Sequence, residues 1–221
     1  MNTTVYIVRH CEAEGNRTGS FQGHIDSDIT DTGNHQLKFL AERFRDIHID
    51  KVFSSPLLRA KRTADAIAEI KGLITKTDNA LIEIDGGEIE NMTYTDIYAK
   101  WPFVEVSWVN SPQDFCAPGG ESMREVYERI WCGVKKIIAK SKGKSIVIAS
   151  HGAAIRCLLC RLTFGDIEKL NSVNWSDNTA VSKFSFDEKL NCSIEYLNDA
   201  SHLPEEFLPQ KSRITSMIKA D

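Results

Sequence analysis

The chain has 221 residues, of which 42% are hydrophobic and 26% are charged, and its formal net charge is −4. This composition predicts one globular domain over residues 1–221 and excludes a disordered chain. A mildly acidic chain without a long Lys/Arg block also argues against nucleic acid as its main partner.

Neither a membrane span nor a secretory signal is expected. Residues 1–4 lead directly into a short apolar strand, without the basic region and long apolar run of a signal peptide. Apolar runs elsewhere are shorter than the about 20 residues that cross a bilayer. We therefore expect a cytoplasmic protein with no membrane partner.

Strand-like and helix-like segments alternate along the chain. Strands are expected at residues 4–8, 51–54, 81–84, 145–150, 178–186 and 192–197, and helices from Asp31, from Pro56, over 121–140 and from 152 to about 162. Residues 11–29 read as a loop, and Ile70 is expected on the buried face of the second helix. This alternation predicts an α/β fold, with a mostly parallel central sheet covered by helices on both faces.

Two histidines lie just past predicted strands. His10 comes after residues 4–8, and His151 comes after residues 145–150. In open parallel sheets, ligands bind outside the carboxyl ends of the strands. Both histidines are therefore expected at a ligand site.

Other residues at strand ends and helix starts carry the chemical groups that hydrolysis of a phosphate ester requires. Arginines such as Arg9 and Arg59 offer planar, multi-donor groups to a dianion, and their charge holds the pKa of a nearby imidazole down. A neutral imidazole is a competent nucleophile. A protonated carboxylic acid, which Glu83 could supply, can give its proton to the leaving oxygen.

Six segments carry motifs that occur in this order in one known family. They are residues 9–16 (Arg-His-Cys-Glu-Ala-Glu-Gly-Asn), 21–33, 54–64 (Ser-Ser-Pro-Leu-Leu-Arg-Ala-Lys-Arg-Thr-Ala), 81–90, 118–122 (Pro-Gly-Gly-Glu-Ser) and 150–152 (Ser-His-Gly). The chain resembles the histidine phosphatase superfamily, the group that includes phosphoglycerate mutase-like phosphatases. The resemblance implies a three-layer α/β/α sandwich with a small insert near the active site.

The resemblance also implies residue roles. His10 would be the nucleophile and carry a transient phosphohistidine, with Glu83 as general acid and then general base. The implied ligands of the phosphoryl oxygens are Arg9, Asn16, Arg59 and His151, with His151 also counted as catalytic. Gln22 would contact the substrate, a small phosphorylated metabolite. No metal and no organic cofactor would take part.

The chain departs from the family pattern at three places. Cys11 stands where Gly is usual, Ser20 where Arg is common, and Ile89-Glu90-Asn91 where Trp-Glu-Gly is usual. The resemblance therefore leaves the substrate preference open.

Residues 86–120 are expected to form the insert, a lid that sets specificity. Its aromatic residues Trp101, Phe103 and Trp108 either contact an apolar part of the substrate or form the small core of the insert. The second interpretation is favoured, because large aromatic side chains usually lie inside proteins.

Other functions remain open at this point. Cys11 and Arg17 fit the Cys-x5-Arg pattern of cysteine-dependent phosphatases, although Glu12 and Glu14 would place carboxylates in a loop that binds a dianion. Phosphoglycerate mutase-type transfer and a non-catalytic phospho-ligand binding protein are further alternatives. The chain could also form a homodimer.

Overall fold

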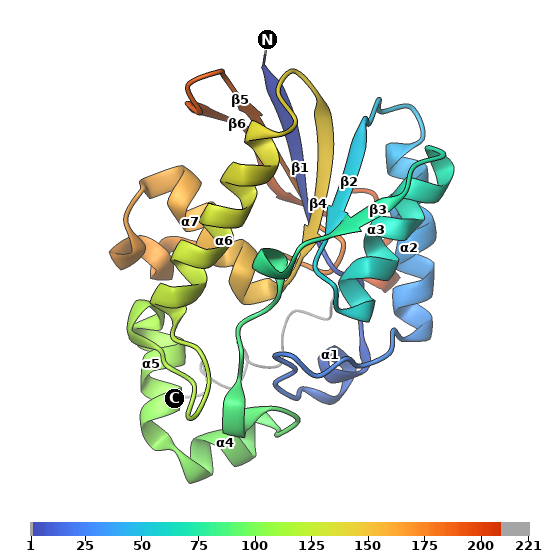
Figure 1. The fold of residues 1–221 in the computed structure, drawn as a ribbon. Helices are drawn as coiled ribbons and strands as arrows, with labels where there is room; N and C mark the ends of the chain where they lie inside the picture. The colour runs from blue at the N-terminus through green and yellow to red at the C-terminus, as the bar shows by residue number, and fades with distance from the viewer. Residues whose placement is uncertain (1, 209–221) are drawn as a thin grey trace.

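The computed structural model describes residues 2–208, and a six-stranded sheet forms its centre (Figure 1). The strands are β1 (Thr3–Arg9), β2 (Lys51–Ser54), β3 (Thr75–Thr77), β4 (Ser145–Ser150), β5 (Val181–Phe186) and β6 (Cys192–Asp199). Their order is β3-β2-β4-β1-β5-β6, with parallel pairing from β3 to β1 and antiparallel pairing at β5. The mostly parallel sheet is confirmed.

Helices cover both faces of the sheet. The helices are α1 (Glu14–Thr18), α2 (Asp31–Phe44), α3 (Leu58–Ile70), α4 (Tyr94–Lys100), α5 (Pro102–Asn110), α6 (Met123–Ala139) and α7 (Gly152–Phe164). Short 3-10 helices lie at η1 (Asn79–Leu81), η2 (Gly87–Ile89), η3 (Pro112–Asp114), η4 (Ile167–Ser172) and η5 (Glu205–Phe207). Helices α6 and α7 lie on one side of the sheet and α2 and α3 on the other, which confirms the three-layer sandwich (Figure 1).

Strand β1 shows why the central strands have continuous apolar sequences. Tyr6 and Val8 pack in the core under α2 and α3, whereas Val5 and Ile7 pack in the core under α6 and α7. All four are at most 5% exposed. Because side chains alternate between the faces of a strand, a strand buried on both faces needs an apolar residue at every position.

Local capping sets where the main helices begin. The Thr30 hydroxyl accepts a hydrogen bond from the Gly33 N–H at 3.0 Å and starts α2. Ser122 and Glu125 form a reciprocal capping box that starts α6. Both helices begin close to the positions expected from the sequence.

The expected strand at residues 81–84 is wrong. Residues Asn79–Leu81 form η1, the next residues pair with no described strand, and the third strand lies earlier, at β3. Arg129 of α6 donates hydrogen bonds to the carbonyl oxygens of Ala80 and Ile82 at 3.1 and 2.9 Å. In this segment, therefore, the side chain of Arg129 satisfies backbone carbonyl groups that would have paired with a neighbouring strand if the segment were a strand.

Two smaller expectations also fail. The predicted loop at 11–29 contains the short helix α1. Ile70 is 48% exposed because it is the last residue of α3, beyond the part of the helix that lies on the sheet.

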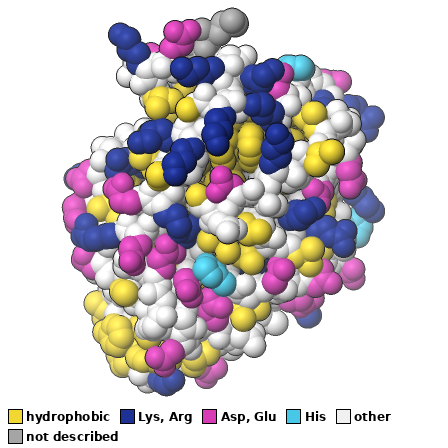
Figure 2. Space-filling view, in the orientation of Figure 1, with side chains coloured by type: hydrophobic (Ala, Val, Ile, Leu, Met, Phe, Trp, Pro, Cys, Tyr) yellow, Lys and Arg dark blue, Asp and Glu magenta, His cyan; other side chains and the backbone are white. Residues whose placement is uncertain are grey.

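Residues 86–120, the expected insert, contain α4 and α5 and an aromatic core. The Trp108 ring lies 5.4 Å from the Phe21 ring and 4.7 Å from the Phe115 ring, measured between centroids. Trp108 therefore has the structural role that was favoured for it, whereas Phe103 on the outer side of α5 is 60% exposed. Figure 2 shows hydrophobic side chains gathered at the lower left, where α5 lies in Figure 1. Within the described chain, no helix is both long and apolar enough to cross a membrane.

The contact between α6 and η1 gives a test of how the segment before Glu83 is held. A Cβ added at Gly133 of α6 would lie 2.3 Å from the Ala80 Cβ of η1. Alanine normally stabilises a helix by about 1 kcal/mol relative to glycine. We expect Gly133→Ala instead to lower the free energy of unfolding by about 1–3 kcal/mol, through overpacking. Urea unfolding measures the change.

The matched control for that test is Cys132→Ala, an exposed position next to Gly133 on the same helix. It should leave the unfolding midpoint nearly unchanged. The double variant Gly133→Ala, Ala80→Gly removes the clashing methyl group and should recover stability. Failure of this rescue would show that the Ala80 contact is not the cause.

Candidate active site

His10 lies directly after β1 and is held from several sides. Its N–H donates to the Ser150 carbonyl at 2.9 Å, and its own carbonyl accepts from the Asn178 amide at 2.9 Å. The side chain is 2% exposed, and Nδ1 lies 2.6 Å from the Cys11 carbonyl oxygen. A carbonyl can only accept, so Nδ1 carries the ring proton. The neutral ring therefore presents a free lone pair at Nε2.

His151 precedes α7 and faces His10, with 5.2 Å between the ring centroids. Its Nε2 lies 2.7 Å from the Ser55 hydroxyl, and the residue is fully buried. Burial and the charge of Arg59 lower the pKa of both histidines well below the usual 6.5. Both rings are therefore neutral near pH 7.

Two arginines lie against this pair. Arg59, in the first turn of α3, is 1% exposed and donates to the carbonyl oxygens of Ile25 and Gly23 at 2.7 and 2.8 Å. Arg9, the last residue of β1, donates to the Ser176 carbonyl. These contacts fix both guanidinium groups and use only part of their donors.

Three buried nitrogens of these residues have no partner. Within residues 2–208, Arg9 Nε, Arg59 Nε and His151 Nδ1 are buried and make no hydrogen bond to the protein. Buried polar groups are normally paired, and an unpaired one costs free energy. The unpaired guanidinium N–H donors of Arg9 and Arg59, beside His10, indicate a pocket prepared for an anion, and His151 Nδ1 adds a donor when Ser55 donates to Nε2.

Glu83 lies in the extended segment that follows η1, at the N-terminus of α7. Its carboxylate accepts hydrogen bonds from the N–H groups of Ala153 and Ala154 at 3.1 and 3.0 Å, and from the Ile84 N–H at 3.0 Å. These N–H groups are among those that a helix leaves free at its start. The Glu83 carbonyl accepts from Arg129 at 3.2 Å, so the segment is held on both sides.

The remaining predicted ligands have visible structural contacts. The Asn16 side-chain oxygen accepts from the Ala13 N–H at 3.0 Å. Gln22 lies across Gly15, where an added Cβ would come within 2.1 Å of Gln22 Cγ, and its oxygen accepts from Ser27 at 2.6 Å. These contacts place both side chains in the loop, and their predicted roles as ligands stay predictions.

Sequence reasoning missed Ser55 and Asn178. Ser55 directly follows β2, just as His10 and His151 follow their strands, so the strand-end rule could have identified it. Asn178, which binds the His10 carbonyl, lies just before β5 and has no such signal.

Cys11 does not have the properties of a nucleophile. It is fully buried, and burial raises the pKa of its thiol to about 11. The Arg17 side chain is 65% exposed and pairs with Glu14 at 2.6 Å. Burial and the raised pKa of Cys11 argue against the cysteine-dependent alternative. The ideal Cβ position of Gly33 in α2 lies 3.5 Å from the Cys11 sulfur, so the Cys11 side chain makes ordinary van der Waals contact with this part of α2.

Comparison with known proteins identifies the family. A model of the histidine phosphatase superfamily (branch 1) matches residues 5–200. Phosphoserine phosphatase 1 of Hydrogenobacter thermophilus is 33% identical over 205 residues, which cover 91% of this chain and 95% of that protein. The chain belongs to the histidine phosphatase superfamily.

Further relatives support the same assignment. The probable phosphoglycerate mutase GpmB of Salmonella choleraesuis is 30% identical over 219 residues, covering 95% of this chain and 99% of that protein. The solved structure of YhfR from Bacillus stearothermophilus has a TM-score of 0.86 at 24% identity, covering 90% of this chain and 98% of that one. This last likeness shows the shared fold.

Cysteine reactivity tests the description of Cys11. Native protein treated with iodoacetamide at pH 8 should be alkylated at the exposed Cys116 and Cys132. Cys11 and Cys160 should stay unmodified, since the pKa of each thiol is about 11 and too little thiolate forms. Peptide mass spectrometry, with urea-unfolded protein as the control, locates the label. Rapid native labelling of Cys11 would contradict its burial.

The lowered pKa values of His10, His151 and His202 predict how stability depends on pH. The pKa of His202 falls to about 4 on burial, and the other two fall well below 6.5. As pH drops below about 6.5, the unfolded chain takes up protons that the folded chain does not, so stability falls. Each histidine contributes a slope of up to about 1.4 kcal/mol per pH unit.

Urea unfolding between pH 7 and pH 5 measures this slope. His10→Asn and His202→Asn should each reduce the slope of the free energy of unfolding against pH by up to the contribution of one proton, about 1.4 kcal/mol per pH unit. If both variants kept the full wild-type slope, the predicted shifts would be wrong.

Proposed function

We propose that this chain is a phosphatase that hydrolyses phosphate monoesters of small metabolites through a phosphohistidine on His10. The observation that carries the proposal is the free lone pair at His10 Nε2, on a ring surrounded by residues with three unpaired buried nitrogens. A nucleophile and an anion pocket thus occupy the same place, at the carboxyl ends of β1 and β4.

The first step transfers the phosphoryl group to the histidine. His10 Nε2 attacks phosphorus, the bond from phosphorus to the ester oxygen breaks, and its electron pair stays on the leaving oxygen. Glu83, protonated in this step, gives its proton to that oxygen. The Nδ1 proton stays on the ring throughout, bound to the Cys11 carbonyl.

The second step releases phosphate. The Glu83 carboxylate takes a proton from water as the water oxygen attacks phosphorus, and the P–N bond breaks with its electrons returning to His10 Nε2. Glu83 is then protonated again and ready for the next ester. Its three N–H contacts hold the carboxylate in one position for both proton transfers.

The other residues stabilise the phosphoryl group during both steps. Charge develops on the oxygens of the transferred group, and fixed donors in a buried site stabilise it without reorganising. We assign Arg9, Arg59 and His151 to these oxygens, with Asn16 as a further ligand and Gln22 toward the substrate. The proposed steps need no metal and no organic cofactor.

The relatives suggest which substrates to try first. One is named a phosphoserine phosphatase and another a probable phosphoglycerate mutase. Phosphoserine is therefore the first substrate, and transfer to a second hydroxyl instead of water is the second candidate activity. A small phosphorylated substrate is the expected partner, and the homodimer and the cytoplasmic location stay predictions.

The direct test is hydrolysis of an aryl phosphate and of phosphoserine by the wild type, His10→Ala and Cys11→Ser. We expect kcat to fall by about 10³-fold or more in His10→Ala, because the covalent route is removed. Cys11→Ser should stay within a few-fold of the wild type, since the buried Cys11 sulfur faces the Arg59 carbonyl of α3 and Gly33 of α2. Trapping of labelled protein from labelled substrate reports the phosphohistidine.

The outcomes separate the candidates. An inactive Cys11→Ser beside an active His10→Ala would contradict the proposed nucleophile. Return of the phosphoryl group to another hydroxyl of the product, without release of phosphate, would favour the mutase. A wild type that binds phosphate esters and hydrolyses none would leave the binding-protein alternative.

A further inference from the structure

Ser55 lies directly after β2, and its hydroxyl is the hydrogen-bond partner of His151. Strands β2 and β4 pair in parallel with Ser54 opposite Ala149, so Ser55 and His151 both lie where this edge of the sheet ends. Both residues are fully buried, and Ser55 Oγ lies 2.7 Å from His151 Nε2. We propose that Ser55 is a positioning residue, which holds the proton of neutral His151 on Nδ1 and thereby makes that nitrogen a hydrogen-bond donor to the phosphoryl group.

The second contact of the Ser55 hydroxyl sets the direction of this hydrogen bond. Ser55 Oγ accepts a hydrogen bond from the Leu57 N–H at 3.3 Å, and it also has one proton to donate. Among residues 2–208, the acceptor within reach of that proton is His151 Nε2. If Nε2 instead carried the ring proton, the Ser55 proton would be buried without an acceptor, which costs free energy. Ser55 therefore donates, and the proton of the neutral ring lies on Nδ1.

His151 Nδ1 is the ring nitrogen that remains for a ligand. Within the described part of the chain it is buried and has no hydrogen-bond partner. It belongs to the ring that faces the proposed nucleophile His10, with 5.2 Å between the centroids. A phosphoryl oxygen accepts a hydrogen bond from an N–H group, whereas a lone pair in the same place would repel it. The tautomer of His151 thus decides whether this ring attracts or repels the dianion.

Protonation of His151 does not supply the donor instead. A doubly protonated imidazole would donate from both nitrogens, whatever its neighbours were. Burial and the charge of Arg59 hold the pKa of His151 well below 6.5, so the ring is neutral near pH 7. A neutral ring has one proton, and the hydrogen bond of one nitrogen decides that the other carries it. In this pocket that hydrogen bond comes from Ser55.

This inference rests on the proposed function, in which His151 is a ligand of the phosphoryl oxygens. Nitrogen-15 NMR of protein labelled in its histidine rings, recorded at pH 7.5, measures each tautomer without requiring activity. A protonated ring nitrogen and one with a lone pair resonate far apart, and the His151 signals are those that His151→Asn loses. We expect the wild type to carry the His151 proton on Nδ1.

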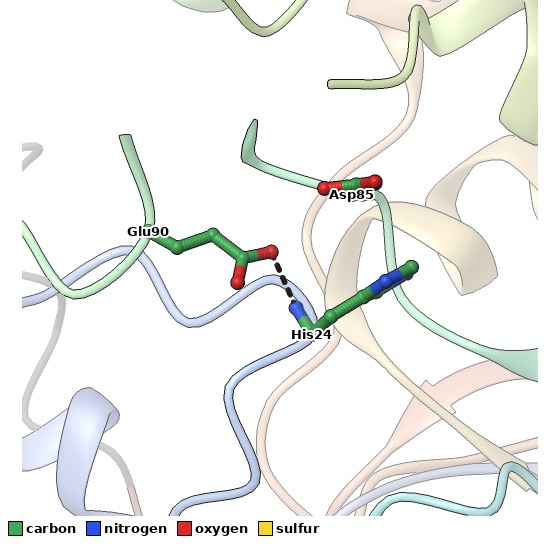
Figure 3. Close-up of side chains that lie close together, drawn as sticks. All are labelled: His24, Asp85 and Glu90. Atoms are coloured by element: carbon green, nitrogen blue, oxygen red, sulfur yellow. Dashed lines mark hydrogen bonds between the residues drawn. The ribbon is translucent and has the colours of Figure 1, made fainter. Parts of the chain in front are cut away.

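Two other histidines are internal references for these spectra. Figure 3 shows the His24 N–H bound to Glu90, and the ring Nε2 of His24 lies 3.0 Å from the Glu83 carbonyl, so its proton lies on Nε2. The His10 ring has the opposite tautomer, because its Nδ1 donates to the carbonyl oxygen of the next residue at 2.6 Å. A His151 spectrum of the His10 type supports the proposal, and one of the His24 type overturns it.

The variant test compares Ser55→Ala with Ser54→Ala. Ser54 is the matched control, because it is an equally buried neighbouring serine whose hydroxyl donates to the Ser55 carbonyl at 2.8 Å and not to a histidine. In Ser55→Ala the fixed tautomer of His151 should be lost, with part or all of the proton on Nε2, because the donor to Nε2 has been removed. Ser54→Ala should keep the wild-type tautomer.

Binding of inorganic phosphate, measured by calorimetry, tests the role of Nδ1 as a donor. Loss of one hydrogen bond to a charged group should weaken phosphate binding by Ser55→Ala about tenfold. The value of kcat/KM for the aryl phosphate should fall by a similar factor. Ser54→Ala should keep the wild-type values of both. A changed tautomer with unchanged phosphate affinity would overturn the contact between Nδ1 and phosphate.

The outcomes for Ser55 and for the proposed function are separate. If the wild type hydrolyses no phosphate ester, the phosphatase proposal is wrong, and the spectra and the phosphate titration still decide the role of Ser55. If the wild type is active while Ser55→Ala keeps both the tautomer and the phosphate affinity, the positioning role is wrong and the phosphatase proposal stands.

The wild-type protein alone provides a further test, which holds even if Ser55→Ala does not fold. Added inorganic phosphate should shift the His151 Nδ1 signal, because the proposed hydrogen bond forms at that nitrogen. A signal that stays unchanged at saturating phosphate would overturn the proposal.

Discussion

Strands β1 and β4 pair in parallel with Arg9 opposite Ser150, and the site depends on this register. The residues that follow, His10 and His151, are therefore neighbours across the sheet, and their rings face one another. A slip of one residue would turn one histidine to the opposite face of the sheet. Apolar residues buried on both faces of β1 prevent such a slip, because either displacement would move the side chains out of their fitted positions.

The electrostatics of the site follow from burial at this position. Buried arginines oppose protonation of the two histidines, and burial acts in the same direction. A protonated His10 would have no lone pair at Nε2, so the arginines that we propose as phosphate ligands also keep the proposed nucleophile in its reactive form. In the proposed mechanism, phosphate binding and the reactivity of His10 have one physical origin, the buried charge of Arg9 and Arg59.

Much of this site could be predicted from the sequence because its residues occupy the ends of strands and the starts of helices. His10 and His151 follow short apolar runs, which are easily recognised. Arg59 lies in the first turn of a helix, and Pro56 marks the start of that helix in the sequence. The strand predicted at Leu81–Ile84 was wrong because a short segment with buried apolar residues has the same sequence pattern whether its backbone pairs with a strand or with Arg129 of α6. The periodicity of apolar residues indicates which residues are buried, but it does not indicate which partners form hydrogen bonds with their backbone groups.

The contacts between distant segments could not be predicted in that way. His24 meets Asp85 and Glu90 because the loop after α1 folds against the segment after Glu83, and no local pattern encodes this meeting. Asn178 likewise reaches the His10 carbonyl from a position 168 residues away along the chain. Such contacts depend on how whole loops pack against one another. A single sequence indicates this packing only where it contains a recognisable motif.

Glu83 also occupies the N-terminus of α7, a position where many proteins bind phosphate through backbone N–H groups. Here the protein's own Glu83 carboxylate accepts from those groups, so in the proposed mechanism side chains alone bind the phosphate. A backbone N–H group remains after almost any substitution, whereas a change in a single codon removes a guanidinium group. Lineages of this protein should therefore tolerate little change at Arg9 and Arg59, and lysine should be a poor replacement at either position.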